Sequence, residues 1–431
     1  MRLPFALIAL AIFTYIELGA ATALKAPFNS APQDWEFWSP RSEIEPDSSY
    51  DADVGRLKNG SLQIQTNENP GSFGAWKTTA RNLQAGEVYR FQAWYRTTGI
   101  DNEERSVIAR LNWRQSNGKM ARPPDFIAGS QKEGEWTLVD YVTRAPENAD
   151  RLEIQLGMGF DANANVWWDD VSLEREKATK SRKARVATIH HKVKGSKSAQ
   201  ENRDIFLELV DQAATRDPDI ICLPEGITVV GNPLDYSEVS ESIPGPSTRQ
   251  LGAAAKRHNT YIVAGIYERE GDLIYNTAVL LDRNGELAGT YRKTHLPREE
   301  WEGGLAPGDS YPVFQTDFGK IGLMICWDVH FPEPSRAMAL QGADLLLLPI
   351  WGGNELLTRA RAIENHVYLV SSSYGMRSFI VDPLGEVVTE AFQDDPIAIA
   401  EIDFEKQYFQ EWLGNMKHRF WKERRPDIPI E

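Results

Sequence analysis

Cysteine is scarce in this sequence, whose 431 residues include only Cys222 and Cys326. In an exported protein, two cysteines would be expected to pair as a disulfide. Cys222 instead lies within the apolar run 219–223, where a small core residue fits, and Cys326 ends a second apolar run and opens into a polar turn. The sequence therefore predicts two free thiols and no disulfide.

Positive charge is also in deficit, with 47 Lys and Arg against 62 Asp and Glu and a formal net charge of −15. Because nucleic-acid binding depends on Lys and Arg that neutralise phosphates, this balance argues against a nucleic-acid partner. The hydrophobic fraction of 42% and the charged fraction of 25% are typical of a soluble globular protein. A chain of this length exceeds one ordinary core, so we expect two domains.

The longest apolar stretch near the N-terminus, Leu3–Ile16, is short for a membrane span and is followed by Glu17. Arg2 precedes it, and small residues after it end in Ala21-Thr22-Ala23, which resembles a cleavage site. This layout predicts a secretory signal over residues 1–26 and an exported protein, periplasmic or extracellular. An uncleaved N-terminal anchor is the alternative.

Residues 30–175 alternate apolar and polar side chains in the runs 89–95, 107–113 and 152–158. Gly, Pro, Asn and Asp separate these runs, a pattern that predicts short antiparallel strands in an all-β sandwich. Residues 176–184 are rich in Lys and Arg and lack large apolar side chains, so we expect a solvated linker there.

From residue 185 onward, strand-like and helix-like patterns alternate, and no internal repeat is visible. Strands are expected at 185–189, 219–223, 260–266, 274–282, 321–325, 344–348 and 368–373, and helices around 205–213, 247–258, 333–341 and 356–366. This alternation predicts an α/β core with helices packed on its sheets. The amphipathic segment 404–431 is expected to pack on a neighbouring surface.

Three reactive side chains come just past apolar strands: Glu225 in LPEG, Lys293 in YRKTHLP and Cys326 in ICWD. Strand ends are where α/β folds place their sites. A poorly solvated carboxylate can act as a base, and a thiol becomes a nucleophile beside a positive charge or a base. Taken singly, each is better explained as a turn carboxylate, a surface lysine or an inert cysteine.

The order and spacing of these segments resemble the nitrilase (carbon–nitrogen hydrolase) superfamily across residues 185–431. The matching segments are DIICLPEG, YNTAVLLDRNGELAGTYRKTHLP, APGD, GKIGLMICWDVHFPEPSR, GADLLLLPIWGG, RARAIENHVYLVSSS, VDPLGE and ERRPDI. The resemblance implies a four-layer α-β-β-α sandwich and a Glu-Lys-Cys triad at Glu225, Lys293 and Cys326. It also implies a second glutamate, for which we favour Glu300 over Glu302.

The resemblance further implies a hydrolase that cleaves a non-peptide C–N bond of a linear amide or N-carbamoyl compound through a thioester on Cys326. Glu225 would act as general base, and Lys293 and the backbone N–H of Trp327 would stabilise the oxyanion. Trp351 would line the substrate pocket, unless it is a core aromatic. No cofactor is expected. The protein is expected to form a homodimer or a larger homo-oligomer. The alternatives are a nitrilase acting on a nitrile and a catalytically silent polysaccharide-binding protein.

The N-terminal region is similar to carbohydrate-binding jelly-roll modules in the segments GEWT (134–137), RAP (144–146) and VWWDDVSL (166–173). The resemblance implies a jelly-roll sandwich, a polysaccharide partner and room for a structural calcium. Aromatic rings stack on the apolar faces of sugars, and five tryptophans are candidates: Trp35, Trp38, Trp76, Trp94 and Trp113. Core packing or an interdomain contact is the competing explanation for each of them.

Overall fold

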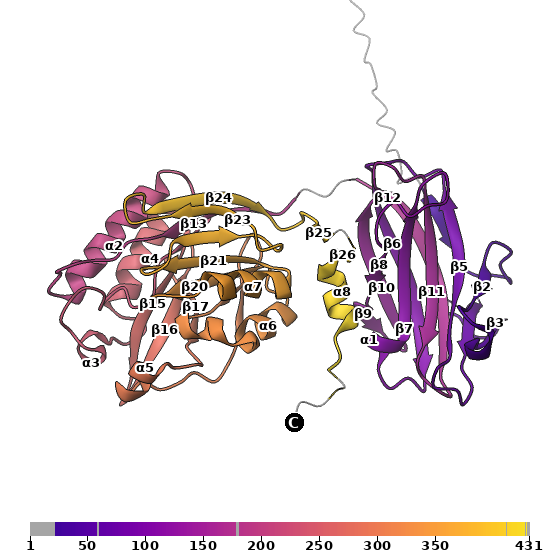
Figure 1. Cartoon of the computed structure of the whole chain (residues 1–431), viewed down its shortest axis with the longest axis horizontal. Helices are drawn as coiled ribbons and strands as arrows, with labels where there is room; N and C mark the ends of the chain where they lie inside the picture. The colour runs from indigo at the N-terminus through magenta and orange to yellow at the C-terminus, as the bar shows by residue number, and fades with distance from the viewer. Residues whose placement is uncertain (1–21, 58–59, 178–180, 411, 427, 429–431) are drawn as a thin grey trace, which may run out of the picture. The chain divides into compact units, whose positions relative to one another are not determined.

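The computed structural model describes residues 22–57, 60–177, 181–410, 412–426 and 428 (Figure 1). The chain divides into two compact units, unit 1 (Met1–Thr179 and Glu411–Glu431) and unit 2 (Lys180–Gln410). Most of the expected signal or anchor, residues 1–26, lies outside the described residues. Its last five residues form strand β1 (Thr22–Ala26). No helix in the described part of the chain is long and apolar enough to cross a membrane.

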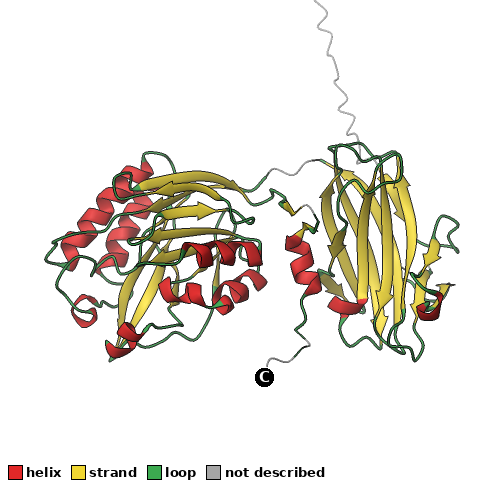
Figure 2. Ribbon diagram, viewed as in Figure 1, coloured by secondary structure: helices red, strands yellow, loops and turns green. Residues whose placement is uncertain are grey.

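Unit 1 consists of two antiparallel sheets, drawn as yellow strands in Figure 2. The first runs β3 (Asp47–Asp51), β4 (Ser61–Gln65), β12 (Asn165–Glu176), β6 (Val88–Thr98), β10 (Trp136–Arg144), β9 (Gln131–Glu133), with β1 also on β12. The second runs β2 (Glu36–Trp38), β5 (Phe73–Arg81), β11 (Arg151–Gly159), β7 (Val107–Arg114), β8 (Asp125–Ile127). Beyond the sheets lie η1 (Ser42–Ile44), α1 (Glu103–Ser106), β26 (Gly414–Asn415) and α8 (Met416–Glu423).

The core of unit 1 lies between the inner faces of its two sheets. Alternate residues of the strands point inward because side chains alternate along a strand, so that Phe91, Leu111, Trp113, Ile154 and Trp168 are all fully buried. The three runs that alternate in the sequence belong to β6, β7 and β11. The strand content expected from the sequence is therefore observed.

For three of the five candidate tryptophans of unit 1, core packing, the competing explanation, is what the structure shows. Trp35, Trp94 and Trp113 are only 8%, 9% and 0% exposed, because they pack in apolar clusters. Trp38 and Trp76 are half-buried. Among the residues that the structure describes, no three His, Cys, Asp or Glu side chains lie together as candidate metal ligands. The structural calcium stays a prediction.

Unit 2 contains two mixed sheets of six strands. The first runs β17 (Leu287–Arg292), β16 (Leu273–Leu281), β15 (Tyr261–Glu270), β14 (Ile220–Cys222), β13 (Lys183–Ile189), β24 (Ile397–Asp403). The second runs β18 (Val313–Gln315), β19 (Lys320–Leu323), β20 (Leu345–Ile350), β21 (Tyr368–Ser373), β22 (Ser378–Val381), β23 (Val387–Ala391). The remaining elements are α2 (Ala199–Ala214), α3 (Tyr236–Val239), α4 (Pro246–His258), α5 (Arg298–Glu302), η2 (Cys326–His330), α6 (Pro332–Leu340), α7 (Glu355–Asn365) and β25 (Phe409–Gln410).

The two sheets of unit 2 pack face to face, with helices on their outer faces (Figure 1). One apolar cluster joins the sheets and includes Ile220 and Leu323. A second cluster lies between α2, α4 and the first sheet, and a third lies between α6, α7 and the second sheet. The prediction of a mixed α/β fold with helices packed on sheets is confirmed.

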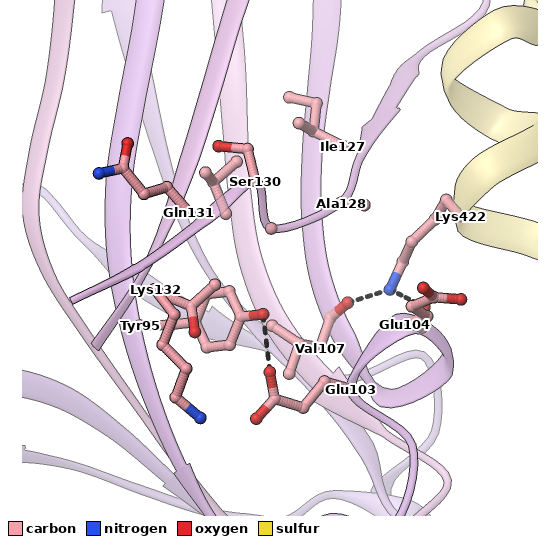
Figure 3. A pocket seen from close by; sticks show the side chains of 13 residues that line it. Tyr95, Glu103, Glu104, Val107, Ile127, Ala128, Ser130, Gln131, Lys132 and Lys422 are labelled. Carbon is pink, nitrogen blue, oxygen red and sulfur yellow. Dashed lines mark hydrogen bonds between the residues drawn. The ribbon is translucent and has the colours of Figure 1, made fainter. Parts of the chain in front are cut away.

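The C-terminal segment differs from the expected boundary, which assigned everything up to residue 431 to the hydrolase domain. Residues from 411 onward group with unit 1, where α8 packs against α1 and β8. The ammonium of Lys422 donates to the backbone carbonyls of Glu104 and Val107 beside a pocket of about 270 Å³ (Figure 3). Burial lowers the pKa of Lys422 to about 8.

Raising the pH from 8 to about 10 should stabilise the wild-type chain relative to a Lys422→Met variant. The pKa of Lys422 is about 8 in the folded chain and ordinarily 10.5, so above pH 8 the unfolded chain binds the extra proton. Because the state that binds more protons is disfavoured as pH rises, folding is favoured over this window. Circular dichroism should show the two melting temperatures diverging.

The exposed Lys417, on the same helix, provides the matched control, and the divergence should be larger for Lys422→Met than for Lys417→Met because only Lys422 is buried. A pH-independent difference between wild type and Lys422→Met would contradict the low pKa of the buried amine.

Candidate active site

Glu225, Lys293 and Cys326 follow three different strands of unit 2. Glu225 comes three residues after β14, Lys293 directly after β17 and Cys326 three residues after β19. The first two strands belong to one sheet and the third to the other, and the apolar cluster between the sheets holds them face to face. The packing therefore brings the three strand ends to one place.

The backbone of Glu225 is fixed by its neighbours on three sides. Gly226 has a φ of +57°, which glycine adopts without strain. Strand β15 passes so closely that a Cβ on Gly265 would lie 2.6 Å from Cα of Glu225. The Tyr374 hydroxyl donates to the Glu225 carbonyl at 2.9 Å. Glu225 is 2% exposed, and its side chain extends from a backbone that these contacts fix.

Lys293 is 1% exposed and lies between two carboxylates. Its Nζ donates to Oε1 of Glu225 at 3.0 Å and to Oε1 of Glu300 at 2.9 Å. Burial by itself would lower the pKa of Lys293, but the negative charges of Glu225 and Glu300 raise it above its ordinary value. Lys293 therefore remains a buried ammonium ion.

Glu300 is the carboxylate of helix α5 that the structure brings to the site. It is 4% exposed, whereas the side chain of Glu302 is 68% exposed and lies 3.7 Å from Arg298. Two residues along a helix lead to nearly the opposite face, so only one of the two can point inward. Burial raises the pKa of Glu300; the Lys293 ammonium opposes this shift and the Glu225 charge adds to it.

Asn276, on strand β16, completes the arrangement and was missed by the sequence analysis. Its Nδ2 donates to Oε1 of Glu225 and to Oε1 of Glu300, both at 2.7 Å. The residue is fully buried within a strand that is otherwise mostly apolar. A buried side-chain amide needs polar partners, so an asparagine in such a strand was the available signal.

Cys326 opens η2 with a φ of +42°, a conformation that non-glycine residues rarely adopt and that is often found at functional sites. Burial and the negative charge of Glu225 raise the pKa of its thiol, and the Lys293 ammonium and a backbone hydrogen bond from Trp351 only partly oppose the shift. The thiol is therefore protonated at rest, and a base has to remove its proton. Cys222 is buried, and neither cysteine forms a disulfide, as predicted.

Asp328 ties the turn that begins at Cys326 to the segment that carries Lys293. Its buried carboxylate accepts from the backbone N–H of Ile325 at 3.0 Å and from the Tyr291 hydroxyl at 2.8 Å. It also accepts from the backbone N–H of His295 at 3.1 Å. One carboxylate thereby fixes residues on both sides of Lys293 relative to the turn of Cys326. The sequence analysis gave this residue no role.

Trp327 and Trp351 are 38% and 36% exposed. The Trp327 ring packs against His330 with centroids 4.2 Å apart, and Trp351 packs edge-on against Tyr374 at 5.2 Å. A Cβ on Gly226 would lie 3.4 Å from the Trp351 ring, which places that ring beside Glu225. Trp351 is therefore not a fully buried core aromatic.

Comparison with protein families matches residues 184–409, more than half of the chain, to the carbon-nitrogen hydrolase family. The chain belongs to this family. The resemblance on which the sequence analysis relied is thereby confirmed for unit 2. The jelly-roll resemblance of unit 1 stays a prediction.

This carbon–nitrogen hydrolase is similar to known enzymes along most of their length. Omega-amidase NIT2 of Mus musculus is 33% identical over 251 residues, which cover 52% of this chain and 89% of the relative. Probable nitrilase C965.09 of Schizosaccharomyces pombe is 33% identical over 235 residues, which cover 49% of this chain and 84% of the relative. The crystal structure of Saccharomyces cerevisiae Nit3 matches with a TM-score of 0.47 and 28% sequence identity. The match covers 53% of this chain and 93% of Nit3. The chain is thus an enzyme with amidase homologues.

Replacing Asp328 of the hydrolase by Asn should lower its hydrolytic activity by about tenfold or more, since a hydrogen bond to a charged group is worth about 1.5–3 kcal/mol. The amide has one acceptor oxygen in place of two, so one of the donors around Asp328 loses its partner. Turnover and melting temperature measure the effect. The matched control is Asp382→Asn in the β22–β23 turn, where the carboxylate accepts from the backbone N–H of Leu384.

The control variant should lose stability and keep its activity. If Asp328→Asn kept wild-type turnover, the hydrogen bonds of Asp328 that join the turn of Cys326 to the segment of Lys293 would not matter for catalysis.

Proposed function

We propose that this enzyme hydrolyses a linear amide or N-carbamoyl compound through a thioester on Cys326. The observation that carries the proposal is the Lys293 ammonium 3.0 Å from Glu225, beside a thiol whose pKa responds to the charges of both. A base, a fixed positive charge and a nucleophile within one buried site are what acyl transfer requires.

In the first half of the reaction, Glu225 takes the thiol proton while the sulfur of Cys326 attacks the carbonyl carbon. The oxygen of that carbonyl becomes negative and needs donors that are already in place. An ammonium has three N–H groups, and Lys293 spends two on Glu225 and Glu300, which leaves one for this oxyanion. The backbone N–H of Trp327 is the second proposed donor.

In the second half, Glu225 gives its proton to the departing amine, the C–N bond breaks and the acyl group stays on sulfur. Glu225 then removes a proton from water, which attacks the thioester and releases the acid, and the proton returns to the thiol of Cys326. Every proton is passed between Glu225, sulfur, amine and water, so the proposed cycle uses no metal or organic cofactor. Glu300 holds the position of Lys293 throughout.

An amide fits the site better than a nitrile does. Oε2 of Glu225 and Oε2 of Glu300 are buried, and neither has a hydrogen-bond partner among the residues that the structure describes. Buried acceptors without donors are costly. The thiol can supply one donor and a substrate N–H another, whereas a nitrile carries no N–H. Similarity to omega-amidases supports the same choice.

A screen of primary amides, N-carbamoyl amino acids and nitriles for ammonia or amine release tests this function. At least one amide or carbamoyl compound should be hydrolysed, and Cys326→Ala should abolish the activity because no other group can carry the acyl chain. The matched control is Cys222→Ala, which removes the buried second thiol and should retain turnover. Activity that survives Cys326→Ala would refute the mechanism, and hydrolysis of nitriles alone would replace the substrate class.

For unit 1 we propose a carbohydrate-binding-like jelly roll, formed mainly by residues 30–175, that holds the enzyme on a polysaccharide. A groove of about 280 Å³ on its second sheet supports this idea, because aromatic rings can stack on sugar faces. The half-buried Trp38 and the half-exposed Phe160 line it together with the guanidinium groups of Arg105 and Arg110. One face of Trp38 is covered by Lys77, which lies 3.8 Å from the ring centroid.

Sedimentation of the full chain with insoluble polysaccharides tests this proposal. Trp38→Ala should lower binding about tenfold, which corresponds to about 1.4 kcal/mol of lost contact with the sugar, while Trp301→Ala, which removes an exposed tryptophan of unit 2, should not. Polysaccharide binding through Trp38 would be refuted if both variants sedimented equally with the glycan. It would also be refuted if the wild type bound none of the glycans.

We further propose that the protein is exported through its N-terminal segment and forms at least a homodimer. Support for export comes from the layout of residues 1–26, and support for the dimer from the family resemblance. N-terminal sequencing of the exported protein would distinguish a cleaved signal from an anchor. Light scattering would give the oligomeric state, and a monomer would overturn the second part.

A further inference from the structure

Asn276 binds the same two oxygen atoms that Lys293 binds. Its Nδ2 lies 2.7 Å from Oε1 of Glu225 and 2.7 Å from Oε1 of Glu300, and Nζ of Lys293 lies 3.0 and 2.9 Å from these atoms. Two nitrogen donors therefore bridge the two carboxylates in parallel. The backbone carbonyl of Asn276 also accepts from the N–H of Lys293 at 2.9 Å.

The orientation of the Asn276 amide is fixed by chemistry. An ionised carboxylate only accepts hydrogen bonds, so the amide must turn its NH₂ group toward both glutamates. That group has two hydrogens, and each carboxylate receives one. The donor capacity of Asn276 is thereby used up, and Oε2 of Glu225 and Oε2 of Glu300 are left without partners among the described residues.

Two carboxylates share one ammonium in this site, which is unfavourable because like charges repel at short range in a buried place. A second lysine would balance the charge, but its positive charge would also hold the proton-accepting carboxylate back from taking a proton. A neutral amide stabilises both ionised groups without adding a charge. It also sets their separation, since both oxygens must reach one nitrogen.

We propose that Asn276 is a positioning residue that holds Glu225 and Glu300 by Oε1, so that Oε2 of Glu225 faces the thiol and stays a proton acceptor. This inference rests on the role proposed above for Glu225. If Asn276 only satisfied buried polar groups, its loss would lower stability and leave the pH dependence of Cys326 chemistry unchanged.

The test replaces Asn276 by Leu, which has a similar size and no donor. Alkylation of Cys326 by iodoacetamide is followed against pH, with Cys222→Ala as the background in every variant. The acidic limb should move up by about one pH unit and the rate should fall about ten- to a hundredfold, because a hydrogen bond to a charged group is lost. With the best amide, kcat should fall similarly and KM should change little.

Thr277→Val is the matched control, since Thr277 is the next residue on β16, is fully buried and donates to Glu268 at 2.8 Å. It should cost stability and leave the alkylation profile in place. Should Asn276→Leu fail to fold, Asn276→Ser retains one short donor and should give a smaller shift in the same direction.

An unmoved profile in folded Asn276→Leu, or an equal shift in Thr277→Val, would overturn the positioning role. Because alkylation needs no substrate, this result is separate from the proposed function, which fails if the wild type hydrolyses no amide or carbamoyl compound.

Discussion

The ammonium of Lys293, held within 3.0 Å of two buried carboxylates, is the contact on which the site depends. Burying three charges in one place is costly unless they are paired and hydrogen-bonded. Lys293 meets that requirement by joining Glu225 and Glu300, which come from different segments of the chain. If this contact were lost, the carboxylates would repel each other, and Glu225 would no longer be held beside the thiol of Cys326.

Other groups of unit 2 keep this contact in place. Two face-to-face sheets bring the strand ends together, and the Tyr374 hydroxyl and the close approach of Gly265 fix the backbone of Glu225. Asp328 ties the turn of Cys326 to the segment of Lys293, and Asn276 bridges the carboxylates without adding charge. Several separate contacts therefore hold Glu225, Lys293 and the turn of Cys326 in place, which is what preorganised catalysis requires.

Apolar periodicity in the sequence predicted the central strands and the four longer helices of unit 2, but it missed β18, β22, β23 and β24. Motif order pointed to Glu225, Lys293 and Cys326, and the structure brings the first two into contact. The sequence favoured Glu300 over Glu302 only narrowly, because the inward or outward direction of each side chain depends on how α5 sits on the sheet. Asn276 was hidden within a buried strand, because its role comes from neighbours far apart in the sequence. The grouping of α8 with unit 1 was missed because amphipathicity does not name the surface that a helix covers.

The central claim is that Cys326, served by Glu225 and Lys293, carries the acyl group as a thioester. Its most direct test is partition of the reaction between water and added hydroxylamine, measured for two amides that share one acyl group and differ in the departing amine. A common thioester predicts the same ratio of hydroxamate to acid from both amides. A ratio that depends on the departing amine would contradict the account, because the acyl group would then never have been held on Cys326 alone.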